Sequence, residues 1–81
     1  MSPRVLKWLP GPCRFFFYAN EGSEPRHVHV MRERKTSKFW LEPVRWASSR
    51  GFAAHELTEI QALVEQHESQ IAEEWNDFYG S

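Results

Sequence analysis

Two histidines separated by one residue, His27 and His29, have the widest range of chemistry of any side chains in this sequence. Imidazole titrates near neutral pH, and it can bind a metal ion, transfer a proton or contact a phosphate. Val28 and Val30 alternate with the histidines, and such alternation is typical of a half-buried strand. We therefore expect a strand with the valines in the core and both imidazoles outside it, where their removal would cost little packing.

Ionisable side chains near the histidines could support acid–base catalysis. A small ribonuclease needs a base, an acid and a cation around the scissile phosphate. Glu21, His27 and His29 are the candidate catalytic residues, and Arg26 or Lys38 could supply the cation. The sequence contains neither a Gly-rich phosphate loop nor an HExxH metal motif, and the ribonuclease activity that we consider needs no metal.

Metal binding is a second use of the histidine pair. Two histidines two residues apart on a strand supply two ligands, whereas zinc usually takes three or four. Glu21, Glu24 or His55 could complete a set, but nothing in the spacing requires it. Cys13 is the single cysteine, which excludes an internal disulfide and a multi-cysteine zinc site within one chain. We predict no metal site and no cofactor.

Strand parity places basic and aromatic side chains on the same face as the histidines. In the preceding strand, Phe15 and Phe17 suit the core, because the other face contains Arg14. Rings and cations on an open sheet can stack bases and hold phosphates. The alternatives are aromatic pairing across strands, or a dimer interface that covers exposed rings. The candidate binding residues are Arg14, Phe16, Tyr18, Arg26, Lys38 and Trp40.

The first half of the chain, which must position these side chains, is predicted to be β-rich. The polar segments 33–37 and 48–51 are predicted to be a hairpin loop and a connector. The predicted strands are 13–20, 26–32, 38–42 and, as a short fourth strand or an irregular approach to a helix, 44–47.

The second half is predicted to be one long helix from about residue 53 to 79. This range contains no Pro and no Gly, and apolar residues recur every three or four positions. Gly80 is placed to end the helix. A continuous helix would be roughly 40 Å long, so a break near Ser69 or an overhang onto a second chain is an alternative. The apolar stripe consists of Leu57, Ile60, Val64, His67, Ile71, Trp75 and Phe78.

These elements predict an α+β fold, with an antiparallel sheet of three to four strands packed on one long C-terminal helix. The length of 81 residues fits a single domain, residues 1–81. Residues 1–50 contain all 10 Lys and Arg with 4 Glu, and residues 51–81 contain 7 acidic residues and no Lys or Arg. The first half is therefore basic and the second acidic. The division fits either a basic sheet beside an acidic helix, or a dipolar surface that binds partners of both signs.

Motifs over nearly the whole chain form a specific combination: FFFY at 15–18, NE at 20–21, EPRHVHV at 24–30, KFWLEPV at 38–44 and RGF at 50–52, followed by Glu56, Leu57, Ile60 and Trp75. This combination resembles the bacterial family called domain of unknown function 4160. One departure is Arg26, where such proteins usually have a second proline before the first histidine. The resemblance implies a small partner protein of the domain of unknown function 2442 family, encoded by a neighbouring gene, and a toxin–antitoxin pairing. It implies no catalytic residues.

The leading functional hypothesis is therefore a bacterial interaction module, one component of a toxin–antitoxin-type pair that binds a small partner protein. The alternative is an RNA-binding protein or a small metal-independent ribonuclease that uses the His27/His29 sheet face. We also predict either self-association as a homodimer or a tight partner, because the rings on the open face exceed what such a sheet can hide. No apolar run approaches the roughly 20 residues of a membrane span, so we predict no membrane association and a cytoplasmic location.

Overall fold

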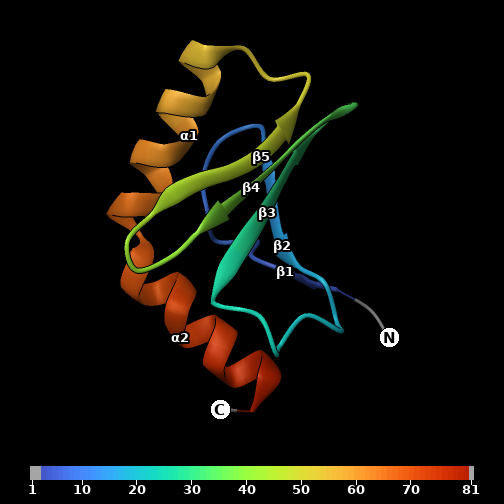
Figure 1. Cartoon of the computed structure of the whole chain (residues 1–81), viewed down its shortest axis with the longest axis vertical. Helices are drawn as coiled ribbons and strands as arrows, with labels where there is room; N and C mark the ends of the chain where they lie inside the picture. The colour runs from blue at the N-terminus through green and yellow to red at the C-terminus, as the bar shows by residue number, and fades with distance from the viewer. Residues whose placement is uncertain (1–2, 81) are drawn as a thin grey trace.

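Five strands followed by two helices make up the part of the chain that the computed structural model describes, residues 3–80 (Figure 1). Each strand pairs antiparallel with the next one along the chain, so the strand order in the sheet is that of the sequence. The α+β fold is confirmed, but the predicted number of three to four strands is wrong. The strands are β1 (Arg4–Val5), β2 (Arg14–Phe17), β3 (His27–Arg32), β4 (Lys35–Trp40) and β5 (Arg45–Arg50).

Most of two polar segments, predicted to be a loop and a connector, lies within strands instead. β4 begins at Lys35, and β5 continues through the serines to Arg50. A turn at 33–34 is all that separates β3 from β4, and Glu33 adopts a φ of 56° there. Backbone pairing along the hairpins makes these segments strands, and hydrophobic patterning does not detect it because most of their side chains are polar.

Two helices, α1 (Ala54–Gln66) and α2 (Glu68–Tyr79), replace the predicted single long helix. The break lies at His67, whose φ of −113° and ψ of 18° leave the helical region. The carbonyl of Leu63 accepts the His67 backbone N–H at 3.2 Å and also lies 3.0 Å from the imidazole Nδ1. A side chain that competes for a helix carbonyl in this way bends or interrupts the helix. Neither helix of the described chain has the length and apolar character needed to cross a membrane.

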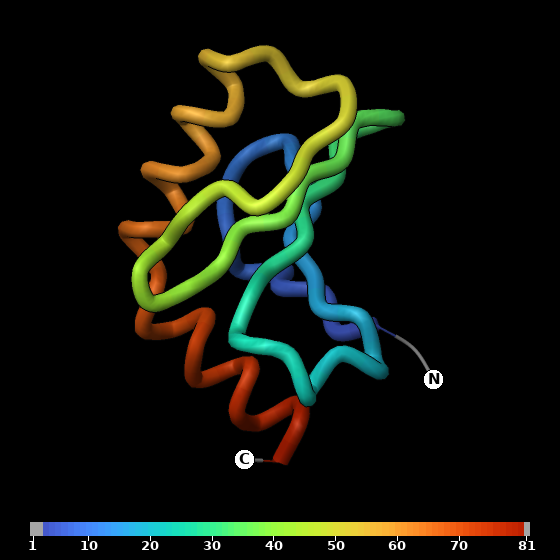
Figure 2. The backbone as a smooth tube through the Cα atoms, viewed as in Figure 1, coloured from blue at the N-terminus to red at the C-terminus, as the bar shows by residue number. Residues whose placement is uncertain are grey.

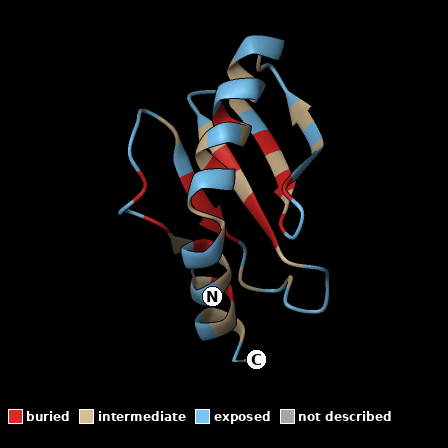
Figure 3. Cartoon of the chain, turned by 90° about the vertical axis from the view of Figure 1, so that its left-hand side faces the viewer, coloured by how far each residue is buried: buried red, intermediate tan, exposed pale blue. Residues whose placement is uncertain are grey.

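The hydrophobic core lies between one face of the sheet and the two helices (Figures 1 and 2). Seen from the helical side, the outer faces of the helices are largely exposed, and buried strand segments lie behind them (Figure 3). Strand parity is confirmed for the four residues assigned to the core from β2 and β3. The buried core consists of Leu6, Leu9, Phe15, Phe17, Val28, Val30, Phe39, Leu41, Val44, Ile60, Val64, Ile71 and Trp75.

Candidate functional site

The sheet face opposite the core, which we call the open face, is organised in rows that cross the strands. Residues opposite one another in an antiparallel pair point to the same side of the sheet. Basic, aromatic and hydroxyl side chains from four strands therefore share one surface. One row consists of Phe16, His29, Lys38 and Ser48, and the next consists of Arg14, Met31, Thr36 and Arg50.

His27 begins β3, and its side chain is completely buried although parity places it outside the core. Its ring centroid lies 4.9 Å from that of Trp75 on α2 and 5.6 Å from that of Trp40 on β4. The expectation that both imidazoles lie free of packing is therefore wrong for His27. His29 is partly accessible, with 15% of its side chain exposed.

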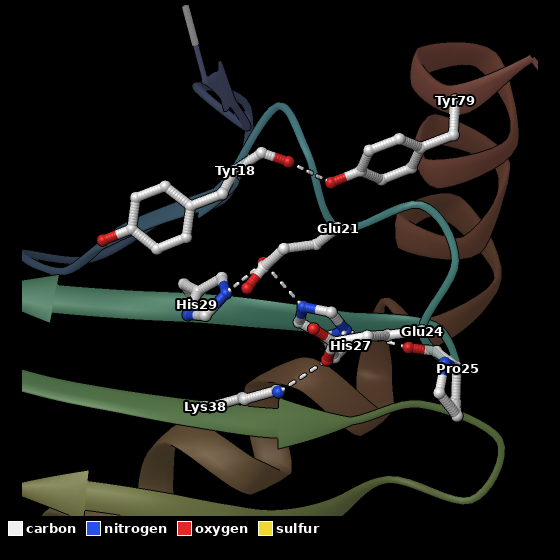
Figure 4. A network of polar contacts seen from close by, with 8 residues as sticks. All are labelled: Tyr18, Glu21, Glu24, Pro25, His27, His29, Lys38 and Tyr79. Carbon is white, nitrogen blue, oxygen red and sulfur yellow. Dashed lines mark hydrogen bonds and ion pairs between the residues drawn. The ribbon is translucent and has the colours of Figure 1, made fainter.

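Glu21 joins the two histidines in a compact group, which we call the His–Glu cluster (Glu21, His27 and His29; Figure 4). Its Oε1 atom lies 2.8 Å from Nε2 of His27 and 2.6 Å from Nε2 of His29. The cluster brings together the three residues that the sequence analysis selected as candidate catalytic groups. Glu24 lies beside it, and His55 is not part of it.

The protonation of the cluster follows from its hydrogen bonds and its burial. Burial acts to raise the pKa of Glu21, but hydrogen bonds with His27 and His29 outweigh it, and the pKa lies below its ordinary value. The pKa of His29 is also lowered, because burial disfavours the imidazolium more than the neighbouring carboxylate favours it. At neutral pH Glu21 is therefore a carboxylate, and His29 is a neutral ring that donates its Nε2–H to it.

The loop that presents Glu21 is held against the end of α2. Gly22 packs so closely on Tyr79 that a Cβ atom at that position would lie 2.7 Å from the Tyr79 ring. The Tyr79 hydroxyl donates a hydrogen bond to the backbone carbonyl of Tyr18, at the other end of the loop (Figure 4). Glu24, farther along the loop, accepts a hydrogen bond from Lys38 Nζ at 3.0 Å. These contacts fix the carboxylate of Glu21 next to the strand that holds both histidines.

A shallow hollow of about 380 Å³ lies on the open face beside the cluster. Lys38 and Arg50 give it positive charge, and His29 and the half-exposed Tyr18 also line it. Within residues 3–80, Arg50 has no ion pair with a carboxylate. The remaining lining residues are Thr36, Ser37, Ser48 and Ser49.

The predicted binding residues differ in how accessible they are. Tyr18 is 44% exposed, whereas Phe16 is only 6% exposed because it stacks on His29 and contacts the Tyr18 ring. The prediction of an exposed ring at Phe16 is therefore wrong. Trp40 is half-buried beneath the ammonium group of Lys38, which lies 4.4 Å from its ring centroid. Arg14 is exposed on the open face.

Arg26 lies outside the hollow, although it was a predicted binding residue. Its guanidinium forms an ion pair with Glu42 at 2.5 Å and hydrogen bonds with Asn76 at 2.9 and 3.1 Å. It therefore connects the start of β3 to α2 and to the turn after β4. The contacts of the Arg26 side chain within the chain are therefore structural.

The hydroxyl groups and Arg50 were not predicted from the sequence, because their segments were expected to be a loop and a connector. A signal for them exists in the sequence, because Ser48 and Arg50 alternate with Ala47 and Ser49 in a strand-like pattern. That pattern contains no large apolar residue, and period-two alternation of small polar residues is weak evidence for a strand. The pairing of β4 with β5 is what brings these residues beside His29 and Lys38.

Comparison with known families assigns the chain to one of them. The model of the family described as domain of unknown function DUF4160 matches residues 13–76. The chain belongs to this family. The matched range contains the whole His–Glu cluster and the lining of the hollow. No curated protein and no solved structure gives a significant match.

Proposed function

We propose that this member of the DUF4160 family binds single-stranded RNA on the open face of its sheet. The observation that supports the proposal best is the hollow, where a lysine and an arginine on paired strands lie near an exposed tyrosine ring. Phosphate groups are recognised by Lys and Arg, and unstacked bases by aromatic rings. An antiparallel sheet that is bare on one face offers both kinds of contact to an extended strand of RNA.

The charge distribution favours an anionic ligand for this face over the rest of the molecule. All ten Lys and Arg precede residue 51, whereas the helices contribute seven acidic residues and no basic ones. The helices cover the opposite face of the sheet (Figure 1), so their acidic outer surface is turned away from the hollow. A polyanion would therefore be attracted to one side of the molecule and repelled from the other.

The binding of a fluorescein-labelled single-stranded RNA, followed by fluorescence anisotropy, tests the proposal. Tyr18→Ala removes the stacking ring, and loss of one stacked base should weaken binding by about 1–3 kcal/mol. Arg50→Gln removes a phosphate contact without breaking an ion pair of the described chain. Lys7→Gln, an exposed cation in the turn after β1, is the matched control and should bind as the wild type does.

Equal affinity of wild type, Tyr18→Ala and Arg50→Gln would contradict RNA binding at the hollow. The same samples can be assayed for cleavage of the RNA without added metal. Cleavage by the chain alone would extend the proposal to a ribonuclease. Glu21 and His29 would then be the acid–base groups at the substrate, because His27 is completely buried.

A second candidate function is binding of a small partner protein, and a hollow on the acidic side of the molecule favours it. This hollow of about 240 Å³ is lined by Trp8, Gln70, Glu73, Glu74 and Asp77. Trp8 is 39% exposed and donates a hydrogen bond to Glu74 at 3.2 Å. An exposed indole surrounded by carboxylates suits a basic segment of another protein.

In this second proposal the chain is one component of a bacterial, cytoplasmic toxin–antitoxin-type pair. The partner would be the product of the neighbouring gene, or a second copy of the chain in a homodimer. Co-purification with the neighbour's product, and its loss on Glu73→Lys, would support the pair. A complex that forms equally well with Glu73→Lys and with the wild type would place the interface elsewhere.

A further inference from the structure

The His–Glu cluster brings three side chains of metal-ligating types close together. One nitrogen from each histidine and a carboxylate oxygen of Glu21 all lie within 4.8 Å of one another. We propose that Glu21, His27 and His29 bind one divalent transition-metal ion of the zinc type. No metal was predicted from the sequence, because two histidines supply too few ligands. The conformation of the loop after β2 brings Glu21 to them as a third ligand.

The hydrogen bonding of His27 prepares it for a metal. Its Nδ1 lies 2.8 Å from the carbonyl oxygen of Pro25, and because a carbonyl can only accept, Nδ1 carries the hydrogen. Nε2 lies 2.8 Å from the carboxylate oxygen of Glu21, and it hydrogen-bonds with this oxygen only while it carries a proton. Two acceptors at this distance need a proton or a cation between them. Metal-binding histidines almost always donate their second ring N–H in the way that His27 does.

The two distances from Glu21 to the histidines come close to those between the ligands of one ion. Ligands of tetrahedral zinc lie about 2.0–2.1 Å from the ion and hence about 3.3 Å from one another. The Nε2–Oε1 separations of 2.8 and 2.6 Å must therefore widen slightly. The hydrogen on Nε2 of His29 must also move to Nδ1, so that Nε2 can bind the ion. A small movement of the Glu21 side chain can widen both distances, since this side chain is 20% exposed and lies on a loop. Both histidines are fixed on β3, and His27 is completely buried there.

The ligand types select the class of metal. Two imidazoles with one carboxylate suit zinc and its first-row neighbours, whereas Mg²⁺ and Ca²⁺ prefer oxygen ligands alone. Three protein ligands leave a fourth position for water, as in zinc sites that act in catalysis. His29 also lines the hollow of the open face, so a phosphate oxygen could occupy that position if the RNA proposal holds. Metal binding itself does not depend on RNA.

Calorimetric titration of the purified, metal-free chain with ZnCl₂, in the absence of RNA, tests the site. We expect one ion per chain. His29→Ala and Glu21→Gln should each weaken zinc binding by more than about 100-fold, because loss of a supporting residue around a metal site already costs 10–100-fold. His55→Ala removes an exposed histidine outside the cluster and should bind zinc as the wild type does. Circular dichroism identifies any variant that fails to fold.

A measurement on the unaltered chain keeps the test independent of the variants. In ¹⁵N-labelled protein, zinc should shift the Nε2 resonances of His27 and His29 and leave those of His55 and His67 in place. Wild type that binds no zinc at millimolar concentration would overturn the proposal. Shifts confined to His55 or His67, or equal binding by His29→Ala and His55→Ala, would overturn it as well. None of these outcomes bears on RNA binding, which is measured without metal.

Discussion

His27 and His29 share one strand and one acceptor, yet their surroundings give them different roles. His27 is enclosed by the rings of Trp75 and Trp40, with both ring nitrogens in hydrogen-bonding distance of an oxygen. His29 lies at the edge of the hollow, partly open to solvent. The buried ring therefore holds the start of β3 and the Glu21 loop in place, and the accessible ring is the one that can meet a ligand.

At this scale we predict that His27→Ala destabilises the fold. The change removes a buried ring that packs on α2, and it leaves the Pro25 carbonyl and the Glu21 carboxylate without one partner each. The free energy of unfolding should fall by about 2–4 kcal/mol. Urea denaturation measures the loss, and His55→Ala, at an exposed site, should change stability by no more than about 0.5 kcal/mol. A His27→Ala variant as stable as His55→Ala would mean that the ring has little structural role.

At the scale of the elements, a few buried side chains hold the helices against the sheet. Ile60 and Val64 on α1 lie in the core, 7% and 0% exposed, and Ile71 and Trp75 continue the buried stripe on α2. The break at His67 divides the predicted helix without interrupting this stripe. The two helices therefore follow the sheet as two segments of one amphipathic surface.

We predict that Ile60→Ala and Val64→Ala lower the free energy of unfolding by roughly 2–4 and 1–3 kcal/mol, because each leaves a cavity in the core. Glu65→Ala, one residue from Val64 but exposed, is the control and should have little effect. Thermal or urea unfolding gives the comparison. Unchanged stability in both core variants would remove α1 from the core.

The start of α1 should make stability depend on pH through Glu56. The backbone N–H of Ala53 and, at 2.9 Å, the ammonium group of Lys35 donate to this carboxylate, and they lower its pKa from an ordinary value of 4.5. A carboxyl with a lowered folded-state pKa contributes stability above its unfolded pKa, and loses it as the pH falls through the folded pKa. The wild type should therefore be more stable than Glu56→Gln at neutral pH, and the difference should shrink below about pH 4. A difference that stays constant down to strongly acidic pH would exclude this linkage.

Local patterns in the sequence predicted part of these elements. The alternation of Val28 and Val30 with the histidines predicted β3 and its buried face, and the spacing of apolar residues predicted the helical half. The polar parts of β4 and β5 were not predicted as strands, because pairing with neighbouring strands, and not hydrophobic patterning, makes them β-structure. The position of the break at His67 was not predicted either, since it depends on a hydrogen bond from that side chain to the Leu63 carbonyl.

At the scale of the whole molecule, the fold separates charge. The acidic helices lie on one side of the sheet, and the cations of Arg14, Lys38 and Arg50 lie on the open face. Strand parity predicted part of the candidate site, because it placed His27 and His29 on the same face, but it missed Arg50 and the hydroxyl groups. The sequence could not show that Trp75 buries His27, or that the loop after β2 turns Glu21 toward both rings. Both features depend on contacts between distant parts of the chain.

The salt dependence of RNA affinity tests the central claim, that the open face binds single-stranded RNA through its cations. Each phosphate contact should contribute about −0.7 to the slope of log K against log salt concentration. Arg14→Gln combined with Arg50→Gln should therefore make the slope shallower by about 1.4, whereas Lys7→Gln should leave it unchanged. An affinity that does not respond to salt, or a double variant with the slope of the wild type, would contradict the account.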